Sequence, residues 1–66
     1  MTPRQKFIKA IGLAKSISDL DYIRDRLAIT DEINRRTIEG RKLSEELFWA
    51  INTKAQEFID SGEKPF

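Results

Sequence analysis

Apolar residues recur three and four positions apart in three segments of the chain, which is the spacing of one face of an α-helix. The first segment opens with Thr2-Pro3-Arg4-Gln5. A threonine cap, a proline at the first helical position and a glutamine that completes a capping box together predict a helix start. We therefore expect a helix over residues 3–16. Its core face would carry Phe7, Ala10, Ile11 and Ala14.

The second segment predicts a helix over residues 19–39. Ser18 is the expected cap, and Gly40 is the expected stop because glycine adopts the left-handed conformation easily. Acidic residues stand four positions before arginines, in the favourable orientation for helical ion pairs. These pairs are Asp31 with Arg35 and Glu32 with Arg36. We therefore expect one continuous helix, bent near Thr30.

The third segment predicts a helix over residues 44–60, with Ser44 as its cap and Ser61-Gly62 as its end. Its broad apolar face would carry Leu43, Leu47, Ala50, Ile51, Ala55, Phe58 and Ile59, with Phe48 at the border. Short connections favour antiparallel neighbours. The fold class is therefore all-α, a small three-helix bundle over residues 1–62, with residues 63–66 as a flexible tail.

Trp49 does not fit the apolar face of the third helix. At about 100° per residue it points to the opposite side, among polar neighbours such as Thr53 and Gln56. Two interpretations are open. Either the first helix or the tail residue Phe66 covers the indole, or Trp49, with Phe48, Thr53 and Gln56, is an anchor for a partner protein, a role that tryptophan often has.

The second helix carries two apolar stripes. Leu20, Ile23, Leu27 and Ala28 form one, and Tyr22, Ile29 and Ile33 form another almost half a turn away. A helix with two stripes needs neighbours on both sides. The second stripe would pack against another helix of the bundle, or would form a face for self-association or for a partner.

Charge is unevenly distributed although the net charge is only +1. Residues 1–15 carry four basic side chains and no acid, whereas residues 43–66 carry two basic and five acidic ones. The two ends could attract each other within the fold or offer two partner surfaces. Basic residues at the first helix and around Gly40 form a candidate nucleic-acid surface. These are Lys6, Lys9, Arg35, Arg36, Arg41 and Lys42.

The chain has no histidine and no cysteine, so it lacks the usual general base and thiol nucleophile. Its carboxylates are spread over helix caps and ion pairs, and its three glycines lie far apart, which excludes a glycine-rich phosphate loop. We therefore expect no enzyme activity, no cofactor and no metal site. No segment has the length of apolar residues that a membrane span needs, and no signal peptide is evident, so we expect a cytoplasmic protein without a membrane partner.

The stretch 14–23, followed by Leu43-Ser44-Glu45-Glu46-Leu47 and Lys54-Ala55-Gln56-Glu57, resembles helical-hairpin segments of small accessory proteins of bacteriophages and mobile elements. Residues 41–47 with Lys54-Ala55 and Glu57 are also similar to the opening of the small sporulation-checkpoint inhibitor of sensor histidine kinases. Both resemblances imply a small helical protein that binds a larger one.

These observations lead to two functional hypotheses. The first is a non-catalytic protein-interaction module that binds a larger host protein through Trp49. Such a module could be an inhibitor or adaptor that a phage or mobile element encodes. The alternative is a nucleic-acid-binding accessory factor that uses the basic residues of the first helix and of the segment 35–42. A homodimer through the second stripe of the middle helix is a further possibility.

Overall fold

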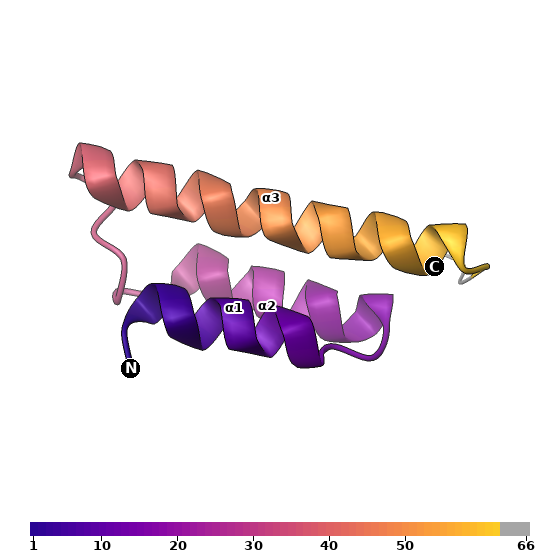
Figure 1. The fold of residues 1–66 in the computed structure, drawn as a ribbon. Helices are drawn as coiled ribbons and strands as arrows, with labels where there is room; N and C mark the ends of the chain where they lie inside the picture. Colours follow the sequence, from indigo (N-terminus) through magenta and orange to yellow (C-terminus); the bar gives the residue numbers. More distant parts are fainter. Residues whose placement is uncertain (63–66) are drawn as a thin grey trace.

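The computed structural model describes residues 1–62, which form three helices: α1 (Pro3–Leu13), α2 (Ile17–Ile29) and α3 (Ile38–Asp60). Each helix packs against the other two, so the predicted three-helix bundle is confirmed. α2 runs in the direction opposite to α1 and α3, which leaves the start of α1 and the end of α3 at opposite ends of the bundle (Figure 1). The predicted flexible tail lies outside the described residues.

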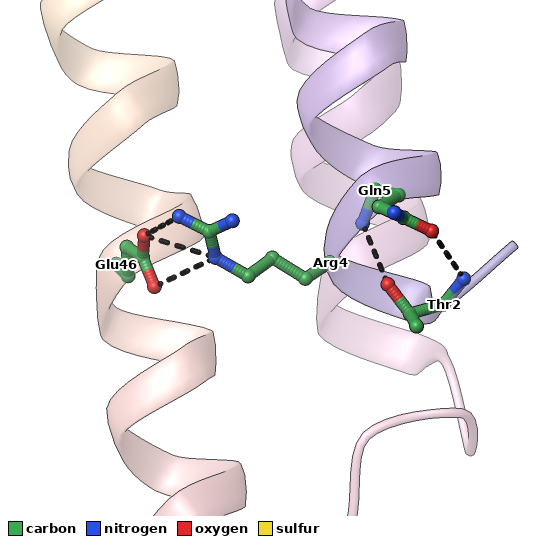
Figure 2. Close-up of polar contacts among 4 residues, drawn as sticks. All are labelled: Thr2, Arg4, Gln5 and Glu46. Atoms are coloured by element: carbon green, nitrogen blue, oxygen red, sulfur yellow. Dashed lines mark hydrogen bonds and ion pairs between the residues drawn. The ribbon is translucent and has the colours of Figure 1, made fainter.

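The start of α1 is capped as the sequence predicts. The Thr2 hydroxyl accepts a hydrogen bond from the Gln5 amide at 3.2 Å, and the Gln5 side chain accepts one from the Thr2 amide at 3.0 Å (Figure 2). The end of α1 differs from the prediction because Ala14 and Ser16 are extended. Ser16, rather than Ser18, caps α2 by accepting from the Asp19 amide at 3.4 Å.

The predicted long middle helix is wrong. α2 ends at Ile29, residues 30–37 form a connecting loop, and α3 starts six residues before the predicted position. Thr37 is the cap of α3: its hydroxyl accepts from the Gly40 amide at 3.0 Å and donates to the Asn34 carbonyl at 2.8 Å. Gly40 therefore lies inside the first turn of a helix and does not end one.

Tertiary contacts explain this difference. A Cβ atom on Gly40 would overlap the backbone carbonyl of Asn34, so the loop packs directly onto the first turn of α3 at a position that only glycine can occupy. The ion pairs expected within a continuous helix do not form in residues 1–62; Glu32 instead contacts Lys6 of α1 at 2.7 Å. Ser44, the predicted cap, is buried inside α3 with 8% of its surface exposed.

The core is built around three leucines that are almost completely buried, Leu20 and Leu27 of α2 and Leu47 of α3. The other members are apolar residues from all three helices and the loop: Phe7, Ile11, Ile23, Ile33 and Ile51. Within residues 1–62 the structure shows no helix with the length and apolar character that crossing a membrane requires.

One ion pair joins the first helix to the last. The Arg4 guanidinium donates two hydrogen bonds to one Glu46 oxygen, the shorter of them at 2.7 Å (Figure 2). These hydrogen bonds lower the pKa of Glu46 below its ordinary value of 4.5, against a smaller opposing effect of desolvation. They also raise the pKa of Arg4. The contact supports the interpretation that the basic start of the chain attracts the acidic end within one fold.

Candidate protein-binding surface

Trp49 lies on the solvent side of α3 and has 73% of its surface exposed. Its neighbours two positions away, Leu47 and Ile51, are almost completely buried, at 0% and 3%. Two residues correspond to about 200° of helical rotation, so the indole points away from the bundle. α1 packs on the opposite side of α3 and does not cover it. The alternative cover, Phe66, lies outside the described residues.

Trp49 borders a shallow hollow on the outer surface of α3. Its volume is about 480 Å³. It is lined by Trp49, Asn52, Thr53, Gln56, Glu57 and Asp60, which we call the Trp49 face. Gln56 donates a hydrogen bond to Asp60 at 2.9 Å. The predicted neighbours Thr53 and Gln56 are therefore beside the indole, but Phe48 is not, because its ring is half-buried against the core.

A second open surface is a groove between α1 and α2, with a volume of about 380 Å³. Phe7, Ala10 and Ile23 form its apolar base; Tyr22 and Ile29 border it and are 66% and 73% exposed. Charged and polar residues complete the lining: Lys6, Arg26, Thr30 and Glu32. We call this the α1–α2 groove.

The predicted second stripe is wrong at one of its three members. Ile33 belongs to the loop and is buried in the core with 4% exposed, whereas Tyr22 and Ile29 stay at the surface. Ile33 belongs to the stripe only if the middle helix continues to residue 39, whereas α2 ends at Ile29. The prediction also missed Arg26, which lies four residues after Tyr22 and three residues before Ile29 and therefore on the same side of α2.

The candidate nucleic-acid residues do not form one patch. Lys6 pairs with Glu32 at the groove. Arg35 is part-buried: it donates to the carbonyl oxygens of Leu27 and Thr30 at the end of α2 and to the Ser44 hydroxyl of α3. The remaining four are exposed on three different segments, α1, the loop and α3. They are Lys9, Arg36, Arg41 and Lys42.

The comparisons with known proteins add nothing to this geometry. No protein-family model, curated protein or solved structure matches the chain. The resemblances to phage accessory proteins and to the kinase inhibitor therefore stay predictions. A functional role for either candidate surface is supported only by the exposure, charge and arrangement of the residues that line it.

Proposed function

We propose that this chain is a non-catalytic protein-interaction module that binds a larger protein through the Trp49 face of α3. The observation that supports this proposal is the exposure of Trp49, 73%, on a helix whose opposite side is fully packed. A tryptophan buried at the centre of an interface typically contributes 2 kcal/mol or more to binding. Leaving the same large apolar ring in water stabilises nothing in the isolated bundle.

The charges around the indole define the chemistry of the partner. Glu45, Glu57 and Asp60 lie on this side of α3 or at its edge. Glu57 is partly neutralised by Lys54 at 3.6 Å, whereas Glu45 and Asp60 make no ion pair within residues 1–62. The complementary surface is an apolar pocket for the indole with lysine or arginine at its border, since opposite potentials favour association.

The expected inhibitor or adaptor role, the phage or mobile-element origin and the cytoplasmic location are finer proposals. The role and the origin rest on the sequence resemblances, and the location is an expectation from the sequence; none of the three rests on the Trp49 face. What the Trp49 face supports is the coarser statement of a binding module.

Two experiments test the proposal, the fluorescence of Trp49 in the unmodified chain and a pulldown with the Trp49→Ala variant. In the free monomer the emission of Trp49, the only tryptophan, is expected to be that of a water-exposed indole and accessible to a soluble quencher. A pulldown from the native host is then expected to lose one specific band with W49A and to keep it with Leu13→Ala. Leu13 is a matched control because it is 68% exposed on a different helix.

Binding of the isolated partner should shift the Trp49 emission to shorter wavelength and protect it from the quencher. A blue-shifted, protected emission in a proven monomer would overturn the proposal, because the indole would then be covered by the chain itself. Equal retention of every band by the W49A variant would also overturn it.

The nucleic-acid alternative has its own test. Binding by a basic surface weakens steeply with salt because counterions are released on association, so retardation of DNA or RNA would be strongest at about 50 mM salt. Lys6 and Arg35 are engaged in contacts within the fold, and this weakens the nucleic-acid alternative, which needs several free basic side chains in one patch. Absence of retardation at that salt concentration would exclude it.

A further inference from the structure

The outer side of α2 carries a pattern of apolar and charged residues that is complementary to itself. Tyr22 and Ile29 are seven residues apart and therefore point in almost the same direction, about 20° apart. Along the helix axis, Asp25 and Arg26 lie between Tyr22 and Ile29. Around the axis, Asp25 lies about 50° to one side of the line through Tyr22 and Ile29, and Arg26 lies about 50° to the other side. The face thus has an apolar centre, an acidic flank and a basic flank.

None of these four residues is used inside the bundle. Tyr22 and Ile29 are 66% and 73% exposed, and Asp25 and Arg26 are also exposed. Neither charge makes an ion pair within the described part of the chain, where Asp21 is the acidic residue that pairs with Arg24. The apolar centre and both charged flanks are therefore available to a second molecule.

Two-fold symmetry decides which orientation of a second copy fits. When two helices run parallel about a two-fold axis, the left flank of one meets the right flank of the other at the same height. In the antiparallel pair each flank meets its own copy. The parallel pair therefore places Arg26 opposite the partner's Asp25 twice, whereas the antiparallel pair places like charges together. With helix axes about 9–10 Å apart, the facing Cβ atoms are about 6 Å apart, a distance that an arginine spans.

The α1–α2 groove lies on the basic flank of this face, because Arg26 borders it. Lys6 of α1 also lines the groove, but its charge is paired with Glu32 at 2.7 Å, so Arg26 supplies the positive charge that is open to a second copy. In the parallel arrangement the second copy therefore presents its acidic flank to this groove. Tyr22 and Ile29 of the two copies meet at the two-fold axis, next to the apolar base of the groove, which is formed by Phe7, Ala10 and Ile23. The charge of Arg26 at the groove, which is unpaired within residues 1–62, therefore fits the acidic flank of a second copy.

We propose that the chain forms a parallel, two-fold-symmetric homodimer through the outer face of α2, with Tyr22 and Ile29 at the centre and reciprocal Asp25–Arg26 ion pairs at the flanks. α2 is about 20 Å long. One face of such a helix buries less than the roughly 800 Å² per partner of a standard stable interface. The dimer is therefore weak and forms at micromolar to millimolar concentration, and it leaves both Trp49 faces free.

Sedimentation equilibrium from about 10 µM to about 1 mM tests whether the dimer exists, over the range of weak complexes. The mass-average should rise from 7.7 kDa toward twice that value. A constant 7.7 kDa over the whole range overturns the proposal. The outer face of α2 would then be left for a different protein.

Charge exchange tests the pairing. Asp25→Arg alone and Arg26→Asp alone should each weaken dimerisation about tenfold, because two attractive pairs become repulsive. D25R/R26D in one chain should restore it, and so should a mixture of the two single variants. Arg41→Asp, an equal charge change at an exposed site on α3, should leave it unchanged. A double variant no better than the singles overturns the parallel pairing.

Disulfide trapping tests the orientation, since the chain has no cysteine of its own. Tyr22→Cys should form a covalent dimer under mild oxidation, because the parallel pair brings position 22 next to its copy. The antiparallel pair would place it beside position 29. Thr53→Cys, on the Trp49 face, should stay monomeric; trapping at this position instead of position 22 would move the interface to α3 and overturn the proposal.

Discussion

Gly40 illustrates how a single residue decides a helix boundary. In sequence it resembles a helix stop, but in the structure it is the third residue of α3, and its Cα packs against the Asn34 carbonyl. Because of this close approach, the Thr37 hydroxyl can accept from the Gly40 amide and at the same time donate to the Asn34 carbonyl of the loop. A side chain at this position would separate the loop from the helix.

We therefore expect Gly40→Ala to destabilise the fold by about 1–3 kcal/mol, the usual cost of overpacking, because the clash is with backbone and not with a movable side chain. Gly12→Ala is the matched control. Its Cβ would meet nothing within 4 Å on α1, so it should stabilise the fold by about 0.5–1 kcal/mol. Urea unfolding of the two variants measures both effects, and equal stability would contradict the explanation of the boundary.

At the level of elements, the connection between α2 and α3 depends on Arg35. Its guanidinium donates to carbonyl oxygens in the last turn and cap of α2, where helices leave such oxygens without internal partners. It also reaches the buried hydroxyl of Ser44 at 3.4 Å. One side chain thus closes the end of one helix and attaches it to the next.

Arg35→Ala should lower the free energy of unfolding by about 1–3 kcal/mol, because charged hydrogen bonds to part-buried carbonyl groups are lost. Arg36→Ala, at the neighbouring exposed position, should change it by no more than about 0.5 kcal/mol. Thermal unfolding followed by circular dichroism compares the two. An unchanged midpoint in R35A would show that the arginine is free, as the nucleic-acid hypothesis requires.

The number of helices, the capping box of α1 and the direction of Trp49 could all be predicted from the sequence. The phase of α3 does not depend on where the helix begins, so the indole was placed correctly although the predicted start was wrong. The loop at 30–37 could not be predicted, because its acid–arginine spacing favours a helix and its true stabilisation comes from distant partners. These partners are Lys6 for Glu32, the core for Ile33, and the end of α2 for Arg35.

At the scale of the whole molecule, the contact between Arg4 and Glu46 makes the stability depend on pH. The hydrogen bond lowers the pKa of Glu46 in the folded state. Its contribution is therefore fully present above the ordinary value of 4.5 and is lost as the pH falls through the lowered pKa. Acid weakens the contact between α1 and α3, and salt weakens it too, since both side chains are about half exposed.

Glu46→Gln should reduce the loss of thermal stability between about pH 7 and about pH 3, because the variant has no carboxylate to protonate there. Glu45→Gln provides the control, as this neighbouring glutamate is exposed and makes no ion pair within residues 1–62. Melting midpoints measured over this range should differ in slope for E46Q only. Parallel slopes for E46Q and the unmodified chain would contradict the assignment.

The burial of Leu47 and Ile51 on either side of Trp49 has a consequence for the entropy of association. The backbone that carries the indole is already immobilised by the core, so only the two side-chain torsions of the ring lose freedom when it is enclosed. A partner would thus meet a preorganised ligand, and calorimetry would record a small heat-capacity change without the large contribution of coupled folding.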